Sequence, residues 1–226
     1  GALRLTGPIA AISVAVLAEQ NNIGLFNWTS LPSELEFILA LIILDLAIYA
    51  QHVMTHKVPL LWAIHKVHHS DRDIDVTTAV RFHPVEIILS MLYKCAVVLL
   101  IGPTPFAVFI FSLLLNLCAM FNHSNLRLPV SVEAALRLFL VTPDMHRVHH
   151  STVTRETNRN FGFSIALWDR LFGTYTAQPV AGHDDVVIGL DEYQSEHPAE
   201  LWWSLALPFH DRSRSKQGSG YKRKSS

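Results

Sequence analysis

The sequence predicts an all-α integral membrane protein, built as a bundle of about four transmembrane helices. A cytoplasmic helical cap is expected to hold a histidine-rich site for two metal ions. The chain has 226 residues, of which 50% are hydrophobic and only 16% charged, whereas a soluble domain is about a quarter charged. The apolar residues are gathered in long runs, and ten of the 13 histidines lie between His52 and His150.

Composition excludes several classes of function. The formal net charge is −1, and no basic, aromatic-rich face appears, so we expect no nucleic-acid partner. Cys95 and Cys118 both lie inside apolar runs, where a thiol behaves as a small hydrophobic group. The sequence therefore offers neither a disulfide framework nor a zinc–thiolate motif.

Four apolar runs predict the membrane spans. The first, within residues 1–22, is short for a crossing of about 20 residues, and we interpret it as a truncated or tilted span. A cleaved signal peptide is the alternative, but EQNN at its end does not resemble a small-residue cleavage site. The second run covers residues 34–56. The third follows Pro84, and the fourth follows the GPTP turn at residues 102–105.

The distribution of Lys and Arg predicts the orientation of this bundle in the membrane. Neither residues 19–33 nor the turn at 102–105 contains Lys or Arg, whereas the other connections do. The positive-inside rule therefore places the histidine motifs on the cytoplasmic side. Residues 132–140 and 198–209 have an amphipathic pattern that suits helices packed on the site or lying at the interface. We expect one domain over residues 1–210 and a basic, disordered tail over 211–226.

The histidines recur at the spacing of one helix face. Residues three and four apart lie on the same face of a helix, and a pair of such imidazoles can clamp one metal ion. A solvated helix face explains one such pair, but not three clusters, two of which, HKVHHS and HRVHHS, agree at five of six positions. We therefore predict metal ligands at His52 and His56, at His65, His68 and His69, and at His146, His149 and His150.

Two further histidines have alternative interpretations. His123 follows the fourth span at its cytoplasmic end, where it is either a ninth ligand or a helix cap. His83 precedes Pro84, where it is either a tenth ligand or the cap of the third span. His183, His197 and His210 have no partner at ligand spacing, and we expect them at the surface.

The residues leave the metal open, because imidazole suits Zn, Cu, Fe and Ni alike. Eight or nine histidines shared by two metals would leave room for an exogenous ligand, which implies catalysis. Apolar surroundings favour a hydrophobic substrate, and the motifs contain no obvious hydrolytic base, which points to oxygen chemistry. A zinc hydrolase remains an alternative and would need Glu86, Glu133 or Glu156 as its base. A non-enzymatic metal carrier is a weaker alternative.

Asp45 and Tyr49 lie on the same helix face as His52 and His56. A carboxylate inside a span is costly and is usually paired or functional. Asp45 is about 10 Å from His52 along the helix, which is too far for direct contact. We therefore expect Asp45 to pair with Lys94 of the third span, and Tyr49 to support a ligand through a hydrogen bond.

These motifs resemble the fatty acid hydroxylase/sterol desaturase superfamily of membrane histidine-motif proteins. The resemblance rests on HxxxH at His52, the two HxxHH motifs, and their order around a membrane hairpin. It extends to RFHPVE from Arg81, FNHSN from Phe121 and TPDMHRVHHS from Thr142. NFG from Asn160 and WDRLFGTY from Trp168 complete it, so that it covers roughly residues 34–175.

The resemblance implies a non-haem di-iron oxygenase that hydroxylates or desaturates a C–H bond of a sterol, fatty acyl or related lipid. It would use two Fe ions, O2 and two external electrons, and zinc could replace iron in purified protein. The ligand roles carry over to the eight motif histidines and to His123. Some members have a histidine pair near His123 where this chain has one, which keeps His83 a candidate.

The resemblance also bears on partners and location. The sequence shows no cytochrome b5-like segment, so a separate cytochrome b5, ferredoxin or reductase is expected to supply electrons. A bacterial inner membrane is favoured, with the endoplasmic reticulum as the alternative. The WDRLFGTY stretch is expected to close over the metal site and to hold the C-terminal cap.

Overall fold

The computed structural model describes residues 2–195 and 197–210, with side chains from Gly7 to Phe209 except 196. Its regular structure is helical, and the described part of the chain contains no β-strand longer than an isolated bridge. Two isolated bridges join Leu140 to Ile165 and Ser151 to Ile188. The predicted all-α class is confirmed. The predicted tail at 211–226 lies outside the described residues.

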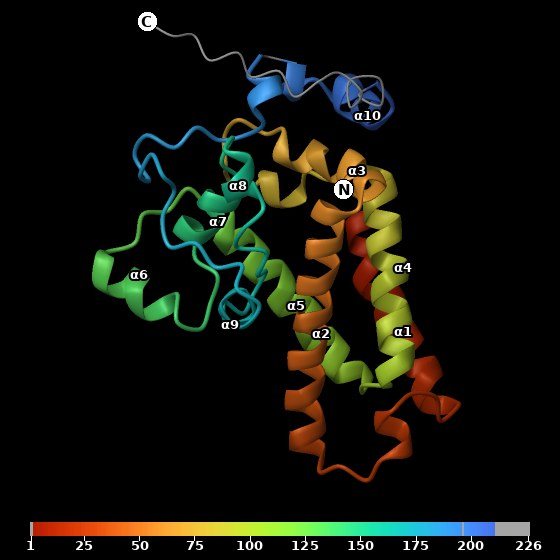
Figure 1. The fold of residues 1–226 in the computed structure, drawn as a ribbon. Helices are drawn as coiled ribbons and strands as arrows, with labels where there is room; N and C mark the ends of the chain where they lie inside the picture. Colours follow the sequence, from red (N-terminus) through yellow and green to blue (C-terminus); the bar gives the residue numbers. More distant parts are fainter. Residues whose placement is uncertain (1, 196, 211–226) are drawn as a thin grey trace, which may run out of the picture.

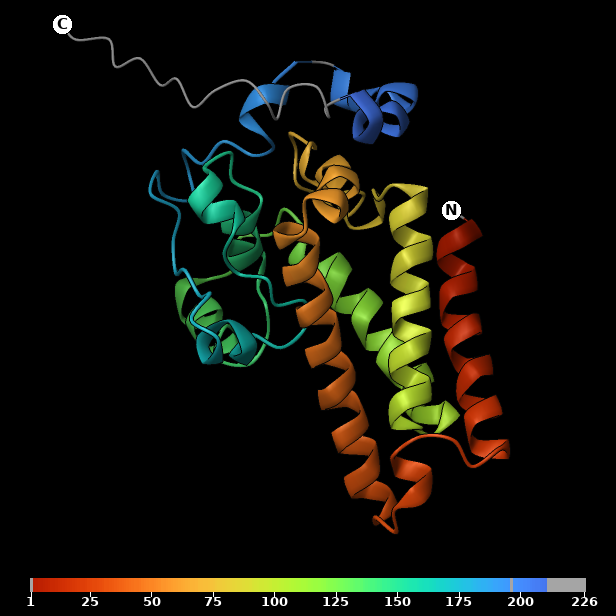
Figure 2. The same ribbon diagram turned by 45° about the vertical axis from the view of Figure 1, so that its right-hand side comes forward.

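Three helices are long and apolar enough to cross a membrane: α2 (Ser33–Lys57), α4 (Pro84–Ile101) and α5 (Pro105–Asn122). The protein is therefore an integral membrane protein. A fourth helix, α1 (Ala2–Gln20), lies beside α4 and also contacts α5 (Figures 1 and 2). Its apolar part, Gly7–Gln20, is shorter than a span. The described residues thus support three spans where the sequence suggested about four.

The bundle has a core of alanines packed against larger apolar side chains, and an apolar outer surface. Each membrane helix turns other apolar side chains outward, among them Leu92, Leu100, Phe106 and Leu117, as a bundle in lipid requires. Alanines of α1 pack closely against larger side chains of the other helices. The main core cluster consists of Ala11, Ala15, Leu44, Ile48, Val98, Val108 and Phe111.

The turn between α4 and α5 fixes one end of the bundle. Gly102 ends α4 with a left-handed φ of 62°, and the Thr104 hydroxyl caps α5 by accepting from the Ala107 amide. Gly24 in the α1–α2 linker lies against this turn, where an added Cβ would stand 2.4 Å from the Gly102 nitrogen. The linker, which includes η1 (Phe26–Trp28), therefore docks on the hairpin.

The cap surrounds the opposite end of the bundle. It contains α3 (Pro59–His69), α7 (Pro143–His149) and α8 (Thr154–Thr157), with α10 (Leu201–His210) packed on α3 (Figure 1). The amphipathic segment expected at 132–140 forms only the short α6 (Val130–Leu136), because the chain then turns into the Leu140–Ile165 bridge. The remaining short elements are α9 (Leu167–Leu171), η2 (Thr78–Val80), η3 (Asp191–Tyr193) and η4 (His197–Ala199).

Candidate metal centre

The cap and the bundle together gather nine histidines at one place. The C-terminal end of α2 supplies two of them, α3 supplies three, and α7 with its C-terminal cap supplies three. The ninth is His123, the C-cap of α5. These elements are far apart in the sequence, and only the packing of α3 and α7 against the ends of α2 and α5 brings them together.

The nine histidines form two groups of candidate ligands. The first contains His52, His56, His65, His69 and His149. The second contains His68, His123, His146 and His150. Within each group the candidate ligand atoms all lie within 4.8 Å of one another.

Each HxxHH motif contributes to both groups, and the two motifs do so in opposite senses. In α3, His65 and His69 enter the first group, while His68 enters the second. In the second motif the i, i+4 pair, His146 and His150, enters the second group, and His149 enters the first. Each short helix therefore presents one pair to one group and one imidazole to the other, which ties the two groups into a single centre.

The atomic spacing in the second group suits a metal ion. His123 Nε2 lies 3.2 Å from His68 Nε2 and 3.0 Å from His146 Nε2. Tetrahedral ligands at bond lengths of about 2.0–2.1 Å stand about 3.3 Å apart. Three buried imidazoles whose Nε2 atoms converge in this way match the edges of a coordination polyhedron.

Five of the imidazoles are oriented through the other ring nitrogen. Nδ1 in each of these lies within hydrogen-bond distance of a protein oxygen, which leaves Nε2 for a metal, the usual arrangement around metal-bound histidine. The Nε2 atoms of His52, His65 and His149 are buried and have no hydrogen-bond partner among the described residues. The Nδ1 contacts are His52 to Phe161 O (2.8 Å), His65 to Glu86 Oε1 (2.5 Å), His68 to Arg81 O (3.2 Å), His123 to Ala119 O (2.8 Å) and His149 to Arg159 O (2.7 Å).

Burial keeps these imidazoles in the form that binds metal. Burial and, next, the neighbouring His150 ring hold the pKa of His69 well below its usual range. The pKa of His149 is lowered in the same direction, by burial and then by His52. Both rings are therefore neutral near pH 7, the state in which imidazole donates a lone pair to a metal.

A loop of the cap carries two of the orienting carbonyls, those of Arg159 and Phe161. The buried carboxylate of Asp169 holds this loop, because it accepts from the Phe161 amide at 2.7 Å and from the Gly162 amide at 2.8 Å. It also accepts from the Thr174 hydroxyl at 2.7 Å. Asp169 therefore acts on the first histidine group through the loop rather than by direct contact.

Asn160 and Gly162 shape the same loop. Asn160 has a left-handed φ of 51°, and its Nδ2 donates to Met145 O at 2.9 Å and to Thr176 O at 2.8 Å. An added Cβ at Gly162 would stand 2.7 Å from the Asp169 carboxylate. Sequence reasoning noted the NFG and WDRLFGTY stretches but assigned no role to Asn160 or Asp169, since neither has a local spacing that points to histidine.

Asp45 has partners other than the expected Lys94. Its Oδ2 accepts from Trp168 Nε1 at 2.8 Å and from the Ile165 amide at 3.3 Å, so the carboxylate joins α2 to the cap. The hydroxyls of Tyr49 and Thr174 lie 2.8 Å apart, and the Tyr49 ring stands edge-on to Phe161, whose carbonyl contacts His52. Tyr49 thus touches the loop behind the first histidine group, whereas Asp45 holds the segment that follows this loop.

The structure places the remaining candidates away from both groups. His83 is the N-cap of α4, where its Nδ1 accepts from the Val85 amide, and its Nε2 lies 3.3 Å from Leu205 O. It belongs to neither of the two histidine groups. His183 is half-buried beside Asp144, and His197 is exposed beside Glu200.

The three glutamates considered as a hydrolytic base have different surroundings. Glu133 binds Arg137 and accepts from Thr142, and Glu156 accepts from the Val180 amide. Glu86 is buried against His65, and its Oε2 has no hydrogen-bond partner among the described residues. Of the three, Glu86 is the one that lines the cavity next to the histidines.

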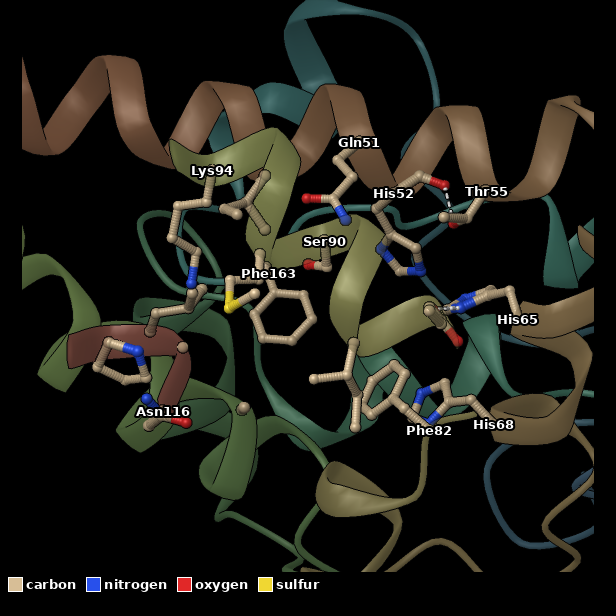
Figure 3. A pocket seen from close by; sticks show the side chains of 18 residues that line it. Gln51, His52, Thr55, His65, His68, Phe82, Ser90, Lys94, Asn116 and Phe163 are labelled. Atoms are coloured by element: carbon tan, nitrogen blue, oxygen red, sulfur yellow. Dashed lines mark hydrogen bonds and ion pairs between the residues drawn. The ribbon is translucent and has the colours of Figure 1, made fainter. Parts of the chain in front are cut away.

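That cavity has a volume of about 150 Å³ and lies between α1, α2, α4 and α5. His52, His65 and His68 stand at one end of it, and Lys94 and Asn116 stand at the other (Figure 3). Much of the wall between them is apolar and includes Ile48, Leu115 and Phe163. A hydrophobic molecule that enters between the membrane helices would meet the histidine centre at the inner end.

Replacement of Glu86 by Gln is expected to lower metal affinity by about 10–100-fold, because the carboxylate orients His65. Metal retained after dialysis against a chelator measures the effect. Glu200→Gln is the matched control, since Glu200 is exposed and belongs to neither histidine group. Equal metal retention in the two variants would contradict the orienting role of Glu86.

Comparison with known proteins shows which family and which relatives the chain is similar to. Residues 37–174 match the model of a family described as fatty acid hydroxylase. The chain is 32% identical to alkylglycerol monooxygenase of Homo sapiens, over 74% of this chain and 34% of that protein. It is 28% identical to an ornithine lipid hydroxylase of Rhizobium tropici, over 80% of this chain and 53% of that protein.

A third relative is cholesterol 25-hydroxylase of Mus musculus, which is 25% identical over 63% of this chain and 47% of that protein. The chain thus spans between about a third and a half of the length of these relatives. No solved structure matches the chain.

Proposed function

The chain belongs to the fatty acid hydroxylase family, and from that premise we propose that it is a membrane-bound di-iron oxygenase. It would hydroxylate a C–H bond of a lipid with O2 and two external electrons. The observation that carries the proposal is the arrangement of nine buried histidines in two groups that open onto an apolar cavity between membrane helices.

The relatives favour hydroxylation over desaturation. Those named above are called a monooxygenase and hydroxylases, and their named substrates are an alkylglycerol, an ornithine lipid and cholesterol. All three are lipids, although they differ widely in their polar groups. We therefore propose a lipid substrate in general, and hydroxylation as the reaction.

Different residues of the chain would have different roles in the proposed reaction. The histidines of the two groups would hold the metals, and two bound iron ions would supply the activation of O2. Glu86 and the carbonyls of Arg159 and Phe161 hold ligand imidazoles in orientation. The cavity wall positions the lipid chain and keeps water from the C–H bond that reacts.

The proposal extends to orientation and partners. The histidine ends of α2, α4 and α5 are proposed to face the cytoplasm, because the connections at that end carry the Lys and Arg residues. A separate cytochrome b5, ferredoxin or reductase would deliver electrons there. A bacterial inner membrane is the proposed location, with the endoplasmic reticulum as the alternative.

The test uses the full chain, expressed with labelled iron and placed in lipid nanodiscs. Roughly two irons per chain are expected, one for each histidine group, with a Mössbauer signature of coupled ions. Hydroxylation of a panel of lipids should then require both O2 and a reductase. Activity with bound zinc that needs neither O2 nor electrons would refute the oxygenase and support the hydrolase.

A further inference from the structure

The cavity beside the histidines has one face with a regular series of polar side chains. Glu86, Ser90 and Lys94 follow one another at intervals of four residues on α4, so all three face the cavity. Glu86 contacts His65 at the inner end. Lys94 lies about 12 Å further along the helix axis. The cavity therefore has a metal end and an ammonium end.

Other polar groups are found near the ammonium end. Asn116 of α5 lines the cavity there, and its Nδ2 donates to Ser112 O at 2.7 Å. Gln51 of α2 lines the wall between the two ends, and its buried Oε1 has no hydrogen-bond partner within the described part of the chain. Figure 3 shows the side chains of Lys94 and Asn116 at the end away from His52, His65 and His68.

The exposure of these residues distinguishes a buried inner end of the cavity from a more exposed outer end. His65 and His68 are buried, Lys94 is half-buried, and Asn116 is exposed on the side of the bundle. Both Lys94 and Asn116 lie well inside spans, so this outer end lies at the level of the hydrocarbon. A lipid that entered sideways from the bilayer beside Asn116 would reach the Lys94 end of the cavity first.

We propose that Lys94, with Asn116, forms a subsite for an oxygen-bearing polar group of the substrate lipid. This inference rests on the proposed function and specifies its substrate class. The lipid would carry a hydrogen-bond-accepting oxygen, as in a carboxylate or a hydroxyl, separated by an apolar chain from the carbon that reacts. A hydrocarbon without such a group would lack this anchor.

The energetics favour an oxygen ligand at this position. A cationic side chain inside a span is costly, and such residues mark substrate pathways when they face a cavity. An ammonium carries three N–H donors and an amide nitrogen two, one of which Asn116 gives to Ser112 O, so both side chains of the subsite are hydrogen-bond donors. Hydrogen bonds from a charged donor are about twice as strong as neutral ones, and more so where water is scarce.

The subsite would also select the carbon that reacts. With the polar group held at Lys94, the length of the cavity decides which part of the chain reaches the histidine end. Lys94 is a positioning residue in this scheme, because the reacting atoms lie near His52, His65 and His68.

Lipid binding tests the proposal without turnover. The probes are three photoreactive C18 chains with a diazirine at the same carbon: an acid, an alcohol and an alkane. Saturable labelling of the full chain in nanodiscs gives the half-saturating concentration for each probe. We expect the acid or the alcohol to bind the wild-type chain about tenfold more tightly than the alkane, the size of one charge-assisted hydrogen bond.

Lys94→Met should remove that preference and leave alkane labelling unchanged, whereas Lys94→Arg should retain it. Lys57→Met, a change at an exposed lysine outside the cavity, is the matched control and should behave as wild type. Asn116→Leu is the second variant and is expected to weaken the preference in the same direction. Metal content and elution volume verify that each variant is folded.

The outcomes separate this proposal from the oxygenase proposal. If the acid binds more tightly than the alcohol, the group bound at Lys94 is an ionised carboxylate. If the two bind equally, it is a neutral oxygen acceptor. Equal labelling by all three probes would overturn the subsite, as would a preference that survives in a folded Lys94→Met variant. Wild-type metal content and O2 dependence are measured separately, so a missing iron pair would count against the oxygenase alone.

Discussion

His150→Ala is expected to remove about one of the two proposed metals and to lower the proposed hydroxylation at least 100-fold. His150 is fully buried and is one of four members of the second histidine group. Loss of a residue that only orients a ligand costs about 10–100-fold in affinity or activity, so loss of a direct ligand should cost more. Metal content per chain and the rate of lipid hydroxylation measure the two effects.

His149→Ala provides the sharpest comparison, because the adjacent histidine belongs to the other group. Each single variant should retain about one metal, and the double variant should retain close to none. His197→Ala, an exposed histidine beside Glu200, should retain both metals and serves as the control. A His150→Ala protein that keeps two metals would contradict the assignment of His150, and loss of both metals in each folded single variant would contradict separate groups.

Asp169→Ala is expected to destabilise the cap and to release metal, although the hydrogen bonds that its carboxylate accepts come from Phe161, Gly162 and Thr174 and not from a histidine. The change leaves the buried amides of Phe161 and Gly162 without their acceptor, at about 1–3 kcal/mol each. For a chain of this size, a loss of about 3 kcal/mol corresponds to roughly 6–12 °C in the unfolding midpoint. The loop that carries the Phe161 carbonyl would then no longer hold His52.

Thermal unfolding and metal content, both measured in nanodiscs, test this expectation. Asp184→Ala is the control, because the Asp184 side chain is 77% exposed and its ion pair is with the exposed Arg127. A small surface effect, within about 0.5 kcal/mol, is expected there. An Asp169→Ala protein with wild-type midpoint and full metal content would show that the loop keeps its position without the carboxylate.

Local sequence patterns determined the membrane helices and the set of possible metal ligands. The long apolar runs dictate membrane helices, because a segment in lipid must satisfy its backbone hydrogen bonds internally. The i, i+3 and i+4 spacing dictates which histidines can share a helix face. All eight motif histidines do reach the centre, with His123 as the ninth. The capping interpretation of His83 was also available from its position before Pro84.

Other features depended on contacts between distant segments. Asp45 was recognisable as a costly buried carboxylate, but its partners, Trp168 and the Ile165 amide, lie in the cap rather than in a neighbouring span. Asp169 acts through backbone amides, which have no sequence signature. The first run reads as a span by its composition, yet α1 offers only a short apolar stretch packed beside α4.

The sequence by itself therefore determined the membrane helices and the histidines available as ligands, since both follow from periodicity within a single helix. Only the tertiary structure decided how those histidines are divided. Periodicity places three imidazoles of each HxxHH motif on one side of a helix, but it does not say which of them meet. The packing of α3 against α2 and of α7 against α5 assigns His65, His69 and His149 to one group, and His68, His146 and His150 to the other.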